Sequence, residues 1–205
     1  MLNYIFSRNH IKLISIFFVV SLLSLSGYSQ KRLERSLYCL QFSFTGIAYF
    51  NHELRLGSNT SFRTEIGIDN IKYWASEVYD IDGYKFAPVL TIEPRYYYNI
   101  DKRHAKSIET NYNSANFVSL KASYHPDWFY ITNENSKMPI SDISIIPSWG
   151  MRRQMGKALR GIFGYELGIG IGYRYIFAQQ YGFENNIHTP AVNFNVRIGI
   201  QYFDM

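Results

Sequence analysis

Ser123, His125 and Asp127 are the residues whose types could support hydrolysis, because a serine nucleophile needs a histidine base that an acid orients. The three side chains of such a site must converge in space. Here they follow one another at every second position along one strand face, and Pro126 interrupts the strand before Asp127. This spacing does not produce triad geometry. We therefore interpret the group as a chance cluster at the mouth of a loop and assign no catalytic residue.

Asp80 and Asp82, followed by Gly83, resemble part of a calcium-binding loop. The remaining oxygen ligands that such a loop requires are missing around them. A hairpin tip in which Gly83 supplies the turn is the better interpretation. His52 lies on the apolar phase of its segment, which indicates an interfacial position rather than metal binding. We therefore expect neither a metal nor a cofactor.

Gly168, Gly170 and Gly172 have the alternate spacing of a glycine-rich nucleotide loop. Such a loop follows a strand and opens a helix, whereas these glycines lie within an unbroken period-two pattern. Glu166 is the only large residue on their face of the segment. We expect the glycines to make room for long side chains of neighbouring strands, and Glu166 to pair with Arg197.

The elements that must position these residues are β-strands. Aromatic residues make up 18% of the chain, which favours strands, and after residue 29 no apolar run reaches the length of a membrane helix. Eight segments alternate between apolar and polar residues, near the roughly 9 to 11 residues with which a tilted strand crosses a bilayer. The segments are Tyr38–Phe44, Ala48–Leu56, Ser61–Ile71, Ala87–Ile100, Phe117–Tyr124, Ile143–Arg153, Phe163–Phe177 and Ala191–Phe203.

The sequence also makes predictions about two of the connections between these segments. The alternation continues in phase across Gly46, so the stretch from Tyr38 to Leu56 fits either two strands joined by a tight turn or one long strand. The polar connection from Asp101 to Asn116 has no apolar period, and we expect it to be a long turn.

Charged and apolar residues lie on opposite faces of every segment. If the segments close into an eight-stranded barrel with the charges inside, side chains fill the interior. An unpaired buried charge costs far more free energy than a paired one. We therefore predict an interior ion-pair network in which acids and bases neutralise one another. Its predicted members are Glu53, Arg55, Arg63, Glu65, Glu93, Arg95, Lys121, Arg152, Glu166 and Arg197.

The alternation alone is compatible with two architectures. A soluble sandwich or lipocalin-like barrel would turn the apolar faces into a common core, whereas a transmembrane barrel would turn them outward to lipid. Three features favour the transmembrane barrel: a secretory signal, aromatic residues such as Tyr96, Tyr173 and Tyr202 near segment ends, and an even strand count that leaves no open edge.

Residues 1–29 have the pattern of a cleaved secretory signal peptide. Basic Arg8 and Lys12 precede an apolar run, from Leu13 to Leu25, that is too short and too interrupted by serine to span a membrane. An uncleaved helical anchor is the alternative. The barrel domain then covers residues 30–205. Loss of the signal lowers the net charge from +5 to +3, which does not indicate a nucleic-acid partner.

The whole pattern resembles the small eight-stranded outer-membrane barrels of Gram-negative bacteria, the OmpA-type transmembrane domain and its OmpX-like relatives. The stretch from Glu93 to Asn99 also resembles a segment of uncharacterised small barrels from the Bacteroidota. The resemblance covers the chain from Tyr38 onward. It implies contact with outer-membrane lipid, including lipopolysaccharide, and insertion by the outer-membrane assembly machinery. That machinery reads a terminal aromatic residue, whereas here two residues follow Phe203.

The sequence thus predicts an all-β protein: an eight-stranded antiparallel up-and-down transmembrane barrel that follows a cleaved signal peptide. We expect a structural or surface-interaction role in the outer membrane. The loops Trp74–Phe86, His125–Pro139 and Gln179–Thr189 would present aromatic and amide side chains to an extracellular protein partner or to lipid. A narrow pore and a lipid-modifying outer-membrane enzyme are the alternatives.

Overall fold

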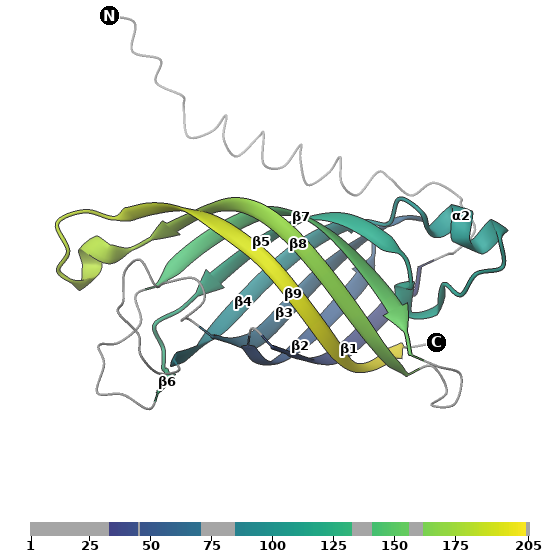
Figure 1. Ribbon diagram of the computed structural model, residues 1–205, viewed down its shortest axis with the longest axis horizontal. Helices are drawn as coiled ribbons and strands as arrows, with labels where there is room; N and C mark the ends of the chain where they lie inside the picture. Colours follow the sequence, from purple (N-terminus) through teal and green to yellow (C-terminus); the bar gives the residue numbers. More distant parts are fainter. Residues whose placement is uncertain (1–32, 45, 71–84, 133–140, 156–161, 204–205) are drawn as a thin grey trace, which may run out of the picture.

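The computed structural model describes residues 33–44, 46–70, 85–132, 141–155 and 162–203, and it shows a closed antiparallel β-barrel (Figure 1). Eight strands form the wall in up-and-down order, and the pairing of β1 with β9 closes it. A short strand, β6, pairs antiparallel with the first residues of β4. The strands are β1 (Ser36–Ser43), β2 (Gly46–Arg55), β3 (Thr60–Asn70), β4 (Lys85–Tyr96), β5 (Asn116–His125), β6 (Ile131–Thr132), β7 (Asp142–Gln154), β8 (Phe163–Ile176) and β9 (Ile187–Phe203).

The prediction of an eight-stranded up-and-down barrel is confirmed. The stretch from Tyr38 to Leu56 forms two strands rather than one, since β1 and β2 pair from Phe42 opposite Ala48 to Ser36 opposite Leu54. The predicted signal peptide and the Asp80–Gly83 hairpin tip lie outside the described residues.

The connection between β4 and β5 differs from the long turn that we expected. β4 ends at Tyr96, before the predicted end at Ile100, and the connection contains the helix α2 (Ile100–Ala105) and the 3-10 helix η2 (Asn111–Asn113). Asp101 lies in the first turn of α2, where a negative charge suits the helix dipole, and it accepts a hydrogen bond of 2.8 Å from Asn59. Such local contacts leave no trace in apolar periodicity.

The two ends of the barrel carry different structures. We call the end with α2 and the last residues of β9 the α2 end, and the opposite end, which carries the 3-10 helix η3 (Ala178–Tyr181), the η3 end (Figure 1). At the α2 end, Tyr97, Ile100 and Phe117 belong to a buried apolar cluster, in which the rings of Tyr97 and Phe117 lie 5.4 Å apart. This cluster lies next to the polar interior, where the Arg95 guanidinium is 4.1 Å from the ring centre of Phe117.

In the described parts of the chain, no helix has both the length and the apolar character needed to cross a membrane.

The barrel has its polar side chains inside and its apolar side chains outside. On β3, the Arg63 side chain points inward and the residue is 1% exposed, whereas on β4 Ile92 points outward and is 50% exposed. The charged faces of the alternating segments therefore turn toward the barrel interior. This arrangement is the reverse of a barrel whose apolar faces form a common core.

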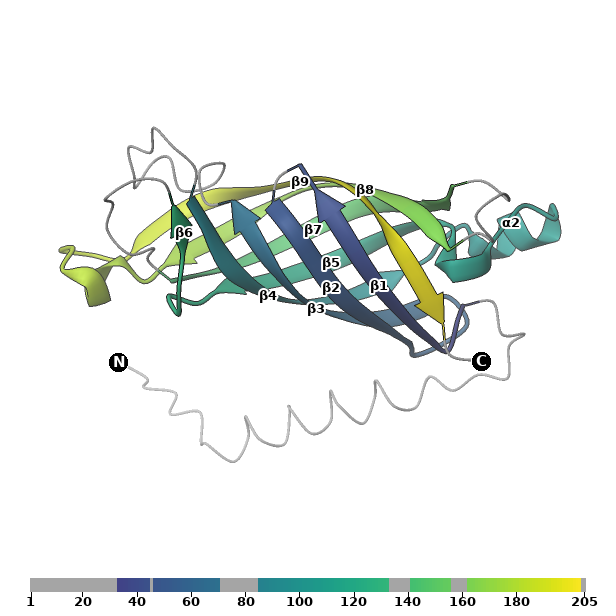
Figure 2. The same cartoon turned by 90° about the horizontal axis from the view of Figure 1, so that it is seen from below.

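The wall is shorter along one side of the η3 end. β9 pairs with β1 only from Phe203 opposite Leu37 to Arg197 opposite Ser43, whereas its pairing with β8 continues to Ile187. In Figure 2 the β1–β2 hairpin accordingly ends well before β9 does. The strands β8 and β9 thus rise above the tip of this hairpin.

Candidate functional site

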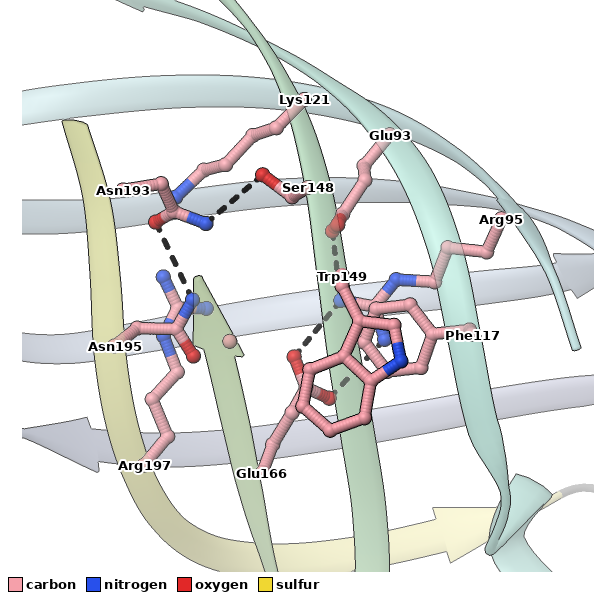
Figure 3. Close-up of a pocket in the computed structure, with 11 residues that line it drawn as sticks. Glu93, Arg95, Phe117, Lys121, Ser148, Trp149, Glu166, Asn193, Asn195 and Arg197 are labelled. Atoms are coloured by element: carbon pink, nitrogen blue, oxygen red, sulfur yellow. Dashed lines mark hydrogen bonds and ion pairs between the residues drawn. The ribbon is translucent and has the colours of Figure 1, made fainter. Parts of the chain in front are cut away.

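Glu166 on β8 lies at the centre of the interior charges and binds arginines from three other strands. Its Oε1 atom accepts hydrogen bonds from Arg63 Nη1 at 2.7 Å and from Arg95 Nη2 at 2.8 Å. Its Oε2 atom accepts from Arg152 Nη2 at 2.8 Å and Nε at 3.0 Å, and from Arg95 Nη1 at 3.1 Å. Figure 3 shows Arg95 reaching Glu166 in this way. A single carboxylate therefore connects β3, β4, β7 and β8.

The predicted pair of Glu166 with Arg197 is wrong. The two residues are directly opposite in the register of β8 and β9, yet Arg197 donates to both oxygens of Glu65, at 2.5 Å and 3.2 Å. The Arg197 guanidinium also lies 4.0 Å from the ring centre of Tyr49. Other guanidinium groups already occupy both oxygens of Glu166. In a narrow barrel a long side chain can reach a distant strand, so register alone does not select its partner.

Glu53 on β2 forms a second centre nearer the α2 end. Its Oε2 atom accepts a hydrogen bond of 2.9 Å from Arg152, which thereby bridges it to Glu166. Its Oε1 atom accepts from the Tyr97 hydroxyl at 2.6 Å, Ser61 at 2.7 Å and Asn113 at 2.9 Å. Charge-assisted hydrogen bonds of this kind are roughly twice as strong as neutral ones, so the buried carboxylate is well compensated.

The remaining acids complete one connected network. Glu93 accepts from Arg95 at 2.7 Å and from Ser119 at 2.7 Å, and Glu65 pairs with Arg63 as well as with Arg197. Four glutamates thus meet four arginines, and their formal charges cancel. We call this set the interior network; its members are Glu53, Arg63, Glu65, Glu93, Arg95, Arg152, Glu166 and Arg197.

Two of the ten predicted network residues lie outside this set. Arg55 is at the α2 end, where its guanidinium donates a hydrogen bond of 2.8 Å to the carbonyl of Leu33. Lys121 is inside the barrel beside the network, and no carboxylate of the described residues lies within 4.0 Å of its ammonium group. Lys121 therefore lies outside the direct ion pairs of the balanced network, and the charges of Glu65, Asp69 and Glu93 act on it from farther away.

Side chains fill the interior at the level of Glu166. A cavity of about 10 Å³, lined among others by Glu93, Arg95 and Asn195, lies here (Figure 3). That volume is at the lower limit for one water molecule. A Cβ atom on Gly168 would lie 2.5 Å from the Asn195 amide nitrogen, so this glycine makes room for a side chain of the neighbouring strand, as the sequence predicts.

His125 lies in a smaller polar cluster at the η3 end of β5. Its Nδ1 atom is 3.1 Å from an oxygen of Asp142, and its Nε2 atom is 3.2 Å from an oxygen of Asp69. Arg174 also contacts Asp142, at 3.2 Å, and the Tyr49 hydroxyl donates to Asp69. Both ring nitrogens of His125 are therefore engaged by carboxylates.

The structure does not bring Ser123, His125 and Asp127 together as a triad. Ser123 shares a hydrogen bond of 2.9 Å with Thr91. Asp127 accepts a hydrogen bond from the Tyr181 hydroxyl. Burial and this hydrogen bond raise the pKa of Tyr181. Each of the three residues thus has another partner.

No protein-family model, no curated protein and no solved structure matches this chain. The site must therefore be judged by its own geometry.

In the described ranges, no group of three or more His, Cys, Asp or Glu side chains is placed to hold a metal ion. His52, which the sequence places at an interface, shares a hydrogen bond of 2.8 Å with Ser36 and stacks on Tyr38 at 4.3 Å between ring centres.

Three residues that donate hydrogen bonds to Glu53 were missed by the sequence prediction: Ser61, Tyr97 and Asn113. Tyr97 follows Glu93 and Arg95 at alternate positions, so the phase of β4 carries a signal that could have placed its hydroxyl inside. Asn113 has no such signal, because it belongs to η2. Its backbone is left-handed, with φ of 59°, which asparagine tolerates better than most residues.

Proposed function

We propose that this chain is an integral outer-membrane β-barrel protein whose interior network fills the barrel as a structural plug. The distribution of side chains carries the proposal, because every strand of the wall turns large apolar side chains outward. Soluble monomers seldom expose a continuous apolar patch larger than a few hundred Å². Exposed members of this surface are Leu40, Phe42, Phe50, Ile66, Ile92, Val118, Leu120, Ile145, Ile169, Ile171, Phe194, Ile198 and Ile200.

The closed wall supports the same proposal. In lipid every backbone polar group must find a partner within the protein, and a closed barrel meets this requirement without an open edge. Aromatic side chains with polar atoms gather near the α2 end, where Trp149 Nε1 donates to the Tyr98 hydroxyl at 2.9 Å. Such side chains are typical of the boundary between lipid and water.

The role that fits a filled interior is structural or interactive rather than conductive. The tightly packed level around Glu166 leaves little room for a continuous water path. At the η3 end, Trp128, Phe129 and Phe183 are exposed and could contact an extracellular protein or neighbouring lipid. Steady single-channel currents from the purified protein in planar bilayers would favour a pore over this plug.

Fractionation tests the membrane location. Expressed in a Gram-negative host, the full chain should be recovered with outer membranes and should migrate differently on a gel before and after boiling, as closed membrane barrels do. An acylase or phospholipase assay on the same membranes tests the enzymatic alternative, with Ser123→Ala as the control variant. Recovery of the folded protein in the soluble fraction would overturn the proposal.

A further inference from the structure

A cavity of about 420 Å³ lies at the η3 end, beside the place where the wall is short. Phe44, at the tip of the β1–β2 hairpin, is 82% exposed, and Val192 and Phe194 on β9 are 65% and 63% exposed. All three side chains line the cavity. We call the gap between them, above the hairpin tip and beside β9, the notch.

The same cavity also has inward-facing walls. Asn193 and Asn195 line it, although they alternate with the outward-facing Val192 and Phe194 along β9. A cavity that touches both faces of one strand extends around the edge of that strand. The notch therefore joins the apolar outer surface to the polar interior.

The charges around the cavity favour an anion. Lys121, Arg174, Arg197 and His125 line it, and Asp69 is the acid among the described lining residues. Arg174 already contacts Asp142, and Arg197 already pairs with Glu65. Asp69 is already engaged by His125 and Tyr49. Among the described lining residues, Lys121 is therefore the basic group that makes no direct ion pair.

Lys121 is the cation that the balanced interior network does not neutralise. Glu65 and Glu93, the network acids whose charges act on Lys121, are already hydrogen-bonded to arginines. Figure 3 draws no interaction line to the Lys121 ammonium. The Nε atom of Arg197 is also buried without a hydrogen-bond partner among the described residues. A charge at membrane depth without a direct ion pair is costly, and a bound anion would supply one.

We propose that the cavity binds an anionic amphiphile with a single acyl chain. The phosphate or carboxylate headgroup would lie inside, on Lys121, and the chain would leave through the notch and lie along Val192 and Phe194. The volume falls within the roughly 300 to 1,000 Å³ of ordinary ligand sites. This inference rests on the proposed membrane location, because an acyl chain outside the notch needs apolar surroundings.

Binding to the full-length protein in a zwitterionic detergent tests the inference. Native mass spectrometry would compare palmitoyl lysophosphatidate and palmitate with the uncharged monopalmitoylglycerol and with inorganic phosphate. Both anionic amphiphiles should bind at one site, while the uncharged lipid and free phosphate should bind at least about tenfold more weakly, since each lacks one half of the recognition. A preference for one anion over the other identifies the headgroup.

Three variants assign the site. Lys121→Met should weaken amphiphile binding about tenfold, and Lys121→Arg should retain most of it, because a charge-assisted hydrogen bond is lost only in the first. Phe194→Asn should weaken binding of the amphiphiles. Ile92→Asn, a matched change of an outward apolar residue on β4, should not. Heat-modifiable migration reports whether each variant is folded.

Equal binding of the uncharged lipid, or unchanged binding in a folded Lys121→Met protein, would overturn the inference. Binding of inorganic phosphate as tight as that of lysophosphatidate would leave an anion site and overturn the role of the notch. Flotation with phospholipid vesicles is scored separately. Protein that floats but binds no anionic amphiphile contradicts only this inference, whereas protein that fails to float contradicts the proposed function as well.

Discussion

Arg63 of β3 donates a hydrogen bond of 2.7 Å to Glu166 of β8, although the two residues are 103 positions apart and their strands are not neighbours in the wall. The bond crosses the barrel interior. Such a contact can form only when the barrel has closed, so the interior network stabilises the closed state as a whole rather than one strand pair.

Glu166→Leu should lower the free energy of unfolding by about 3 to 5 kcal/mol, because it leaves buried guanidinium groups without their shared carboxylate. Denaturant unfolding of the protein in lipid vesicles measures the loss. Adding Arg63→Leu should recover part of it, since one excess buried charge is removed while Glu65 keeps Arg197. Adding Arg197→Leu should recover nothing, because Arg197 neutralises Glu65. Recovery with Arg197→Leu instead would contradict the observed pairing.

Tyr97→Phe should destabilise the barrel by about 1 to 3 kcal/mol, because it removes a buried hydrogen bond to the Glu53 carboxylate while the ring keeps its packing against Phe117. Tyr202→Phe is the matched control. Tyr202 is exposed, so its change should remain within about 0.5 kcal/mol. Equal effects of the two changes would argue that the Glu53 centre contributes little.

The period-two pattern predicts the strand count, the inward face and the pool of interior charges, because alternate side chains of a strand must point to opposite sides. It does not predict which charges meet. Glu166 lies opposite both Arg152 and Arg197 in the register. It binds Arg152 together with the distant Arg63 and Arg95, but not Arg197. That choice depends on the width of the closed barrel, a property of all strands together.

The α2 end shows a second limit of sequence reasoning. Asn113 reaches Glu53 from a short 3-10 helix whose left-handed residues carry no periodic signal. The notch likewise depends on unequal strand lengths: β1 stops at Ser43, whereas β9 begins at Ile187. Periodicity detects the strands reliably but says little about how far each one rises above its neighbour.

Gly172→Ala should destabilise the barrel more than Gly168→Ala. A Cβ atom on Gly172 would lie 2.6 Å from the backbone Cα of Ile146, whereas on Gly168 it would meet the end of the Asn195 side chain, which can move. Overpacking against fixed atoms typically costs about 1 to 3 kcal/mol. Unfolding midpoints of the two single variants test this order. The reverse order would mean that the side-chain contact is the more rigid of the two.

The stability cost of an arginine at two different depths on the outer surface tests whether this surface faces lipid. Ile92→Arg places a guanidinium midway along β4, and Leu56→Arg places one at the β2–β3 turn near the α2 end; both native side chains are about half exposed. In a bilayer the first change should cost about 2 to 4 kcal/mol and the second about 0 to 1 kcal/mol, because arginine near the interface reaches water. Unfolding in vesicles measures both. In a barrel surrounded by water, two exposed arginines would cost similar amounts, so equal losses would contradict the proposal that this surface faces lipid.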